Sequence, residues 1–219
     1  MTSDFEASDP SGADVSTSHE RASGRSWDAT YRDADPAPWD IGRPQAPFVR
    51  IASERGFAGP VLDAGCGTGE HALLAASLGV RVLGVDLAAT AVSLARTKSL
   101  ERGLDAEFAV ADAFELQRLG RTFHTVLDCG LFHTCDTNER PRYVASLASA
   151  TEPGATLYLL CFSDEAPDFG PHPISREELR TAFDDHDGWK IVSVEPDRIH
   201  TTFTGDEGIA AWFATMRRT

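Results

Sequence analysis

The sequence predicts an α/β protein built on a mostly parallel β-sheet that helices cover on both faces. Short apolar segments such as 61–64 and 80–85 alternate with longer segments in which apolar residues recur at helical spacing. Strands that are apolar on both faces are typical of a parallel sheet buried between helices. A loop with three glycines follows the first apolar segment directly, where a parallel sheet places a ligand-binding turn.

The elements follow one another in a regular order. Phe48, Ile51 and Ala52 recur at helical spacing and predict a helix over 46–55. Five apolar runs predict buried strands over 61–64, 80–85, 106–110, 125–129 and 157–162. Helices are predicted between them over 70–78, 88–102 and 139–150. After a helix near 175–183, two closely spaced strands are expected to form an antiparallel hairpin at one sheet edge, over 190–195 and 198–203.

The first residues differ in composition from the rest of the chain. Residues 1–24 are rich in Ser, Asp, Thr and Gly and offer almost nothing to bury, so we expect a disordered acidic tail. Residues 25–219 are expected to form a single domain, because 219 residues hold one well-buried core and hardly two. Within this domain, 25–57 is expected to cover the ligand-binding edge of the sheet. The segment 163–173, which contains three prolines, is expected to form a surface loop beside that edge.

The overall charge argues against several classes of partner. The net charge of −14 disfavours binding to nucleic acid or to an anionic membrane surface. No apolar run approaches the roughly 20 residues that cross a bilayer, and the amino terminus resembles no secretory signal, so a cytoplasmic location is expected. The four cysteines lack C-x-x-C spacing, so neither a metal site nor a disulfide is expected; they are Cys66, Cys129, Cys135 and Cys161.

The glycine loop lies in the segment 61–70, with the sequence VLDAGCGTGE. Its glycines let the backbone approach a ligand closely, and a helix amino terminus follows directly. A dinucleotide site is the main rival, but its fingerprint is G-x-G-x-x-G, and Glu70 stands here where the third glycine belongs. A glutamate is also badly placed beside a pyrophosphate. The loop therefore favours a ligand without phosphate.

Acidic residues follow the next two predicted strands. Asp86 ends the second strand, where its two carboxylate oxygens can accept both hydroxyls of a ribose. Asp112 follows the third strand and can accept from an adenine amino group, while the Ala113 N–H can donate to a ring nitrogen. The segment 127–133 ends the fourth strand. All these residues lie at carboxyl ends of strands, where open α/β sheets bind ligands.

These motifs together resemble those of the class I S-adenosylmethionine (SAM)-dependent methyltransferases, whose fold is a Rossmann-like seven-stranded sheet. The resemblance extends over residues 27–203. VLDAGCGTG matches the first motif of that family, and APWDIGRP at 37–44 resembles the P-W-D-x-G-x-P element of its thiopurine, thiol and halide branch. The stretch 170–203, with ISREELR at 174–180, resembles mycobacterial enzymes that methylate heterocyclic toxins and hydroxyquinolones.

The resemblance implies that the cofactor is SAM and that residues at the strand ends hold it. Asp86 would bind the ribose, Asp112 and Ala113 the adenine, and the glycine loop the methionine part. Trp39 would close over the sulfonium, whose charge is attracted by an aromatic face, although Trp39 is equally suited to anchoring the cover beside two prolines. The expected cofactor-binding residues are Trp39, Asp63, Gly65, Gly67, Asp86, Leu87, Asp112, Ala113 and Cys129.

Methyl transfer chiefly requires that an acceptor lone pair is aligned behind the methyl carbon. An oxygen acceptor is helped by a base, and His133, at the end of the fourth strand, is the best-placed candidate. The alternative for His133 is a structural role, capping a helix or bonding the backbone. The expected substrate-pocket residues are Trp27, Tyr31, Phe132, Phe169 and His172, with 163–173 as the substrate-side loop.

The sequence therefore predicts a SAM-dependent methyltransferase, a monomer or homodimer, that acts on the oxygen or sulfur atom of an aromatic or heterocyclic metabolite or toxin. A thiol or halide acceptor is the alternative within the same branch. A SAM-binding regulator would lack the second pocket that the aromatic residues predict. An NAD-dependent reductase is disfavoured by the glycine spacing, and a macromolecular acceptor by the lack of a basic groove or docking domain.

Overall fold

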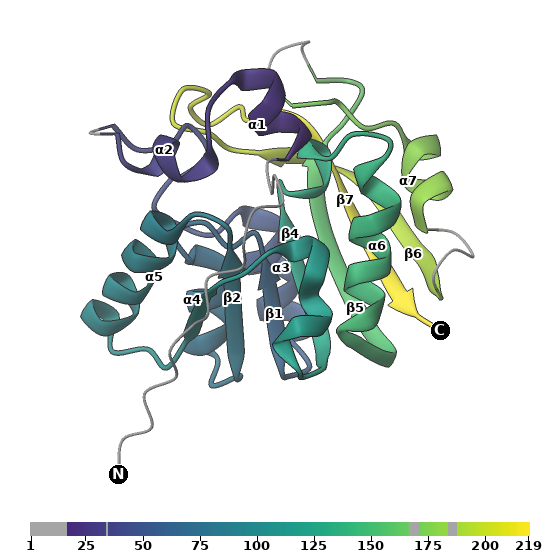
Figure 1. The fold of residues 1–219 in the computed structure, drawn as a ribbon. Coiled ribbons are helices and arrows are strands. Elements are labelled where there is room, and N and C mark those ends of the chain that lie inside the picture. Colours follow the sequence, from purple (N-terminus) through teal and green to yellow (C-terminus); the bar gives the residue numbers. More distant parts are fainter. Residues whose placement is uncertain (1–16, 34, 167–170, 184–187) are drawn as a thin grey trace.

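The computed structural model describes residues 17–33, 35–166, 171–183 and 188–219. Within them, strands form one sheet in the order β3-β2-β1-β4-β5-β7-β6 (Figure 1). The strands are β1 (Val61–Ala64), β2 (Val82–Asp86), β3 (Glu107–Val110), β4 (Phe123–Cys129), β5 (Thr151–Phe162), β6 (Trp189–Ile199) and β7 (Ile209–Arg218). The first five are parallel, and β7 runs antiparallel to both β5 and β6. The predicted mostly parallel sheet with an antiparallel edge is confirmed.

Helices cover both faces of this sheet. One face carries α3 (Ala46–Glu54), α4 (Glu70–Ser77) and α5 (Ala89–Arg102), and the other carries α6 (Glu139–Ser149), α7 (Arg176–Phe183) and the 3₁₀ helix η1 (Ala113–Leu119). Successive side chains of a strand point to opposite faces, so Val61 packs in the core under α3, α4 and α5, whereas Leu62 packs in the core under α6 and α7. The burial of both faces explains why the central strands β1 and β2 are mostly apolar.

Two short helices, α1 (Ser18–Ser23) and α2 (Trp27–Tyr31), lie over the carboxyl ends of the parallel strands (Figure 1). The expectation of a disordered tail through residue 24 differs from the structure at α1. The Thr17 hydroxyl accepts the N–H of Glu20, and the Glu20 carboxylate accepts the N–H of Thr17. This reciprocal capping box fixes the first turn of α1. The rest of the expected tail, residues 1–16, lies outside the described residues.

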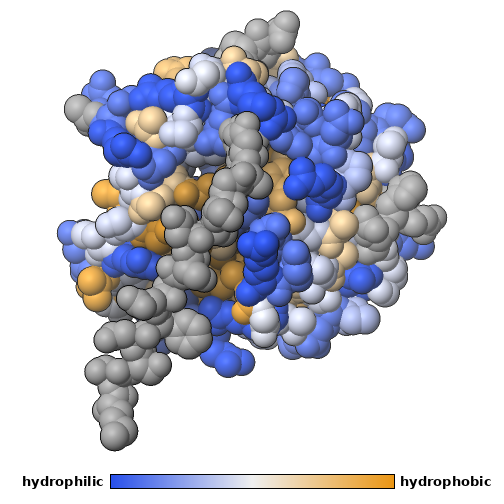
Figure 2. Space-filling view, viewed as in Figure 1, coloured by the Kyte–Doolittle hydropathy of each residue, from blue (hydrophilic) through white to orange (hydrophobic). Residues whose placement is uncertain are grey.

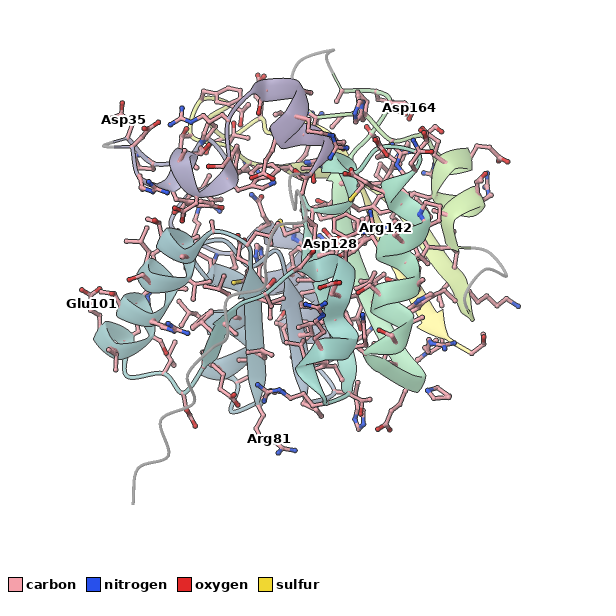
Figure 3. The ribbon with its side chains drawn as sticks, viewed as in Figure 1. Asp35, Arg81, Glu101, Asp128, Arg142 and Asp164 are labelled. Carbon is pink, nitrogen blue, oxygen red and sulfur yellow. The ribbon has the colours of Figure 1, made fainter. Side chains whose placement is uncertain are left out.

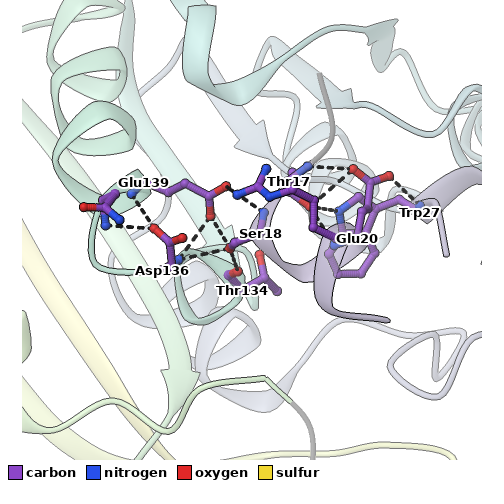
Figure 4. A network of polar contacts seen from close by, with 9 residues as sticks. Thr17, Ser18, Glu20, Trp27, Thr134, Asp136 and Glu139 are labelled. Atoms are coloured by element: carbon purple, nitrogen blue, oxygen red, sulfur yellow. Dashed lines mark hydrogen bonds and ion pairs between the residues drawn. The ribbon is translucent and has the colours of Figure 1, made fainter. Parts of the chain in front are cut away.

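Contacts with distant residues hold α1 on the domain (Figure 4). Ser18 donates its N–H to the Glu139 carboxylate at 2.6 Å, and its hydroxyl to the Thr134 carbonyl at 3.2 Å. Glu139 begins α6, and Thr134 ends the 3₁₀ helix η2 (Phe132–Thr134). Helix α1, which precedes the cover, is therefore attached to the turn that follows β4.

The strands of the edge hairpin differ from the predicted ones. The predicted strands 190–195 and 198–203 are wrong, because 189–199 forms the single strand β6 and its partner is β7. Pro196 and Asp197 resemble a turn in the sequence, yet both pair within the ladder, opposite Trp212 and Ala211. Proline is tolerated there because β6 is the edge strand of the sheet.

A buried carboxylate holds the turn after β4. Asp128 lies near the middle of the fold, whereas charged residues such as Arg81 and Glu101 lie at its periphery (Figure 3). The Asp128 carboxylate accepts the N–H of Leu131 at 2.9 Å and the hydroxyl of Tyr143 at 2.9 Å. Burial raises the pKa of this carboxyl to about 7. These hydroxyl and amide donors thus stabilise a carboxylate that is otherwise costly to bury.

Replacing Tyr143 with Phe should therefore destabilise the fold. We expect Tyr143→Phe to lower the free energy of unfolding by about 1–3 kcal/mol, because it removes one of the donors to a buried carboxylate. Tyr158→Phe is the matched control, since no partner of the Tyr158 hydroxyl is recorded among the described residues, and it should change stability by less than about 0.5 kcal/mol. Urea denaturation measures both, and equal losses would contradict the role given to the Tyr143 hydroxyl.

Candidate functional site

A cavity of about 370 Å³ lies along the carboxyl ends of the parallel strands, beneath the cover. Figure 2 shows hydrophobic surface in the hollow below α1 and α2. Most of the predicted site residues that the structure describes line this cavity: Trp27, Tyr31, Trp39, Gly65, Gly67, Asp86, Leu87, Asp112, Ala113, Cys129 and His133. The structure thus brings together residues that lie over a hundred positions apart in the sequence.

Other predicted residues lie elsewhere. Asp63 is buried beneath the glycine loop, where its carboxylate accepts the N–H of Ala72 at 2.9 Å, and burial raises the pKa of this carboxyl to about 7. Phe132, predicted as a pocket wall, is instead buried in the core against Phe183. His172 is exposed and is not among the residues that line the cavity. Phe169 lies outside the described residues.

The glycine loop forms the floor of the cavity. Gly65, Gly67 and Gly69 all have positive φ, in the left-handed region that favours glycine. A Cβ atom on Gly67 would lie 2.8 Å from the Tyr31 hydroxyl oxygen of the cover, so a side chain there would displace Tyr31. The Gly67 N–H donates to the Asp86 carboxylate at 2.8 Å, which joins the ends of β1 and β2.

The carboxylates of the floor retain acceptor capacity. Asp86 also accepts the N–H of Ala88 at 2.8 Å, and burial raises the pKa of its carboxyl above the ordinary value. Asp112 accepts the N–H of Phe114 at 2.8 Å, and burial likewise raises the pKa of its carboxyl. A carboxylate has about four lone-pair sites, so each can accept further hydrogen bonds from a ligand. The two carboxylates of Asp86 and Asp112, set between apolar walls, fit the ribose and base of a nucleoside.

The cover is fastened to the glycine loop beside Trp39. The indole N–H of Trp39 donates to the Tyr31 hydroxyl at 2.8 Å, and its ring meets that of Trp27 edge-on at 5.7 Å. The next residue, Asp40, accepts the hydroxyl of Thr68 at 2.8 Å. Lys98 donates to the same Thr68 oxygen at 2.7 Å. These contacts hold the Trp39 segment against the loop that it covers.

The sequence did not indicate the wall formed by the β6–β7 connection. Ile199, Thr201, Phe203 and Ile209 line the cavity from this hairpin. Gln45 ties the hairpin to the cover, because its amide group both donates to the His200 carbonyl at 2.8 Å and accepts the His200 N–H at 2.9 Å. No local motif marks these residues, and the misplaced strands hid them.

His133 lines the cavity from η2. Its Nδ1 accepts the N–H of Phe162 at 2.9 Å, and its ring stacks on the Phe162 ring with centroids 4.3 Å apart. Burial, together with smaller contributions from His19 and His172, lowers the pKa of His133 to about 3. Because His133 Nδ1 already accepts the Phe162 N–H, the geometry does not favour the predicted role of general base.

Comparisons with known proteins identify the family to which the chain belongs. A family model described as a methyltransferase domain matches residues 61–154. The chain is 35% identical over 202 residues to the 2-heptyl-1-hydroxyquinolin-4(1H)-one methyltransferase of Mycobacteroides abscessus, covering 87% of this chain and 88% of that protein. The chain belongs to the class I SAM-dependent methyltransferases. As a member of this family it uses S-adenosyl-L-methionine as its cofactor.

Two further similarities place this methyltransferase among related folds. It is 36% identical, with a TM-score of 0.78, to a solved structure concerned with the conversion of a disulfide bond into a thioacetal group during echinomycin biosynthesis; 87% of this chain and 89% of that chain are covered. It is 29% identical over 157 residues to the probable thiol methyltransferase 2 of Arabidopsis thaliana, covering 69% and 68%. The hydroxyquinolone and thiol resemblances in the sequence are thus both confirmed, with the thiol one more distant.

Two other properties concern only the part of the methyltransferase that the structure describes. Within it, no helix is long and apolar enough to cross a membrane. The same residues include no group of three His, Cys, Asp or Glu side chains arranged to hold a metal ion.

Loss of the Asp86 carboxylate should weaken cofactor binding. If Asp86 accepts the ribose hydroxyls, Asp86→Ala should lower SAM affinity by roughly 1–3 kcal/mol, the range for hydrogen bonds to a charged group. Asp105→Ala is a matched control, because Asp105 is exposed in the loop between α5 and β3. Isothermal titration calorimetry measures both. Unchanged affinity in Asp86→Ala would remove this residue from the cofactor site.

Proposed function

We propose that this methyltransferase transfers the methyl group of SAM to an oxygen atom of an aromatic or heterocyclic small molecule, a metabolite or a toxin. The observation that carries the proposal is the aromatic lining of the cavity. Its six Phe, Trp and Tyr residues come from the cover, from the strand ends and from the β6–β7 connection: Trp27, Tyr31, Trp39, Phe114, Phe162 and Phe203. Aromatic walls with few polar groups suit a planar apolar acceptor. The hydroxyquinolone substrate of the Mycobacteroides relative supports the same class.

The proposed cofactor position follows the strand ends. Asp86 would bind the ribose, and Asp112 with Ala113 the adenine, which would pack on Leu87. The loop at Gly65 and Gly67, which Asp63 supports from below, would hold the methionine part, with the backbone near Cys129 reaching the amino group. When bound, the cofactor supplies an electrophilic methyl group on a sulfonium. The acidic residues at β2 and β3 fit the nucleoside of SAM, because SAM carries no phosphate group that they would repel.

The chain itself chiefly aligns the acceptor and excludes water. Trp39 lies over the glycine loop, held by Tyr31 and by the Asp40–Thr68 hydrogen bond, so its ring is suited to facing a sulfonium. Trp27 and the docked helix α1 close the same side of the cavity. Water kept out of this space strengthens the attraction between the acceptor oxygen and the sulfonium.

A thiol or halide acceptor is the second candidate, because the chain is also similar to a probable thiol methyltransferase. It would need no base near neutral pH, since thiolates form readily. The same aromatic lining is compatible with an aromatic thiol. The two candidates differ in the acceptor atom, which an activity screen identifies.

In the screen, purified protein and SAM are incubated with each of four acceptors in parallel. They are 2-heptyl-1-hydroxyquinolin-4(1H)-one, a simple phenol, an aromatic thiol and iodide, and mass spectrometry identifies each methylated product. We expect the hydroxyquinolone to be methylated on oxygen with the highest kcat/KM. Transfer only to the thiol or to iodide would overturn the proposal in favour of the second candidate. SAM binding without transfer to any acceptor would point to a regulatory protein.

A further inference from the structure

The hydrogen bond between Phe162 and His133 determines the protonation of the histidine ring. A neutral imidazole has one nitrogen that accepts and one that carries the proton. Because His133 Nδ1 accepts the Phe162 N–H at 2.9 Å, the proton of the neutral ring is on Nε2. The group that remains available to a ligand is therefore a donor.

This donor belongs to a side chain that lines the cavity. His133 is a lining residue, and no hydrogen bond from its Nε2 is recorded among the described residues. In that same part of the chain, the fully buried polar side-chain atoms without a partner are Trp189 Nε1 and Arg218 Nε. Nε2 of His133 is not one of them, so it retains access to the cavity.

The donor is also held rigidly. The Phe162 ring stacks on the imidazole with 4° between the planes. The turn that carries His133 is fixed by Asp128, which accepts the N–H groups of Leu131 and Phe132. A donor that is fixed before the ligand arrives loses little freedom when it binds.

The surroundings of His133 are suited to keeping the ring neutral. The titratable groups that act on it are His19 of α1 and His172 of the segment before α7, and both disfavour a charged ring. Asp128, behind the turn, accepts hydrogen bonds from backbone N–H groups and from Tyr143. Glu139 of α6 likewise binds Ser18 and Asp136. Neither carboxylate has a recorded contact with the imidazole among the described residues.

We propose that His133 donates its Nε2–H to the acceptor oxygen, and that the substrates of this site are aromatic hydroxy or N-hydroxy compounds acidic enough to bind as oxyanions. This inference rests on the proposed oxygen acceptor. The substrate proton leaves to solvent before binding. The oxyanion then forms a bond to the methyl carbon as the methyl–sulfur bond breaks, and the electron pair of that bond goes to sulfur, so no base on the protein is needed.

Two variants of similar size separate a donor from a base. His133→Gln keeps an N–H donor near the position of Nε2, whereas His133→Asn retains an acceptor for the Phe162 N–H but has no donor that reaches as far. Neither can take a proton as a base at neutral pH. We expect His133→Gln to retain kcat/KM for the hydroxyquinolone within about tenfold, and His133→Asn and His133→Ala to lose more, up to roughly 100-fold. Equal losses in all three variants would overturn the donor role.

The pH dependence of the native protein provides a measurement that does not depend on how the variants fold. If the oxyanion binds, the midpoint of kcat/KM against pH should follow the pKa of the acceptor, and should move down when an electron-withdrawing substituent makes the hydroxyquinolone more acidic. A midpoint that stays fixed while the acceptor changes would indicate a base on the enzyme and would overturn the inference. S-adenosylhomocysteine affinity, measured for each variant, shows whether the cofactor site is intact.

The outcomes distinguish this inference from the proposed function. Native protein that methylates no oxygen acceptor contradicts the proposed function, and the inference falls with it. Native protein that methylates the hydroxyquinolone, with a fixed pH midpoint or equal losses in the three variants, leaves the function standing and contradicts only the donor role.

Discussion

The hydrogen bond from the Gly67 N–H to the Asp86 carboxylate connects the two strand ends on which the cavity depends. It requires that the loop after β1 turns back toward β2, which the left-handed conformations of Gly65 and Gly67 allow. It also orients Asp86 so that part of its carboxylate faces the cavity. The floor is thus built by backbone conformation and one partly buried carboxylate, rather than by a set of long side chains.

The cover depends on this floor. Tyr31 lies so close to Gly67 that a side chain at this position would displace it, and Tyr31 in turn accepts the indole N–H of Trp39. The Asp40–Thr68 contact fastens the cover to the glycine loop, and the Ser18–Glu139 contact fastens the preceding helix α1 to α6. The cavity is therefore enclosed by segments from both ends of the chain, the cover at one end and the β6–β7 connection at the other.

The central sheet and the floor could be predicted because their signals are local. Each parallel strand is a short apolar run, and Asp86 and Asp112 occupy the positions where such runs end. The parts that were missed depend on contacts between distant residues. Helix α1 has six residues and buries none of them, although the Thr17–Glu20 spacing of its capping box was a visible sign. Phe132 and His133 are neighbours on a tight 3₁₀ turn, so one faces the core while the other faces the cavity, a difference that sequence alone does not show.

In the proposed arrangement, the cofactor lies along the carboxyl ends of β1, β2 and β3, under the cover. A crystal structure of the protein with S-adenosylhomocysteine tests it most directly. We expect both ribose hydroxyls to contact Asp86, the adenine to lie between Leu87 and the Asp112–Ala113 segment, and the sulfur to point toward the side of the cavity lined by Trp39 and His133. A nucleoside bound away from Asp86, or a cavity whose floor changes so that Gly67 no longer contacts Asp86, would contradict it.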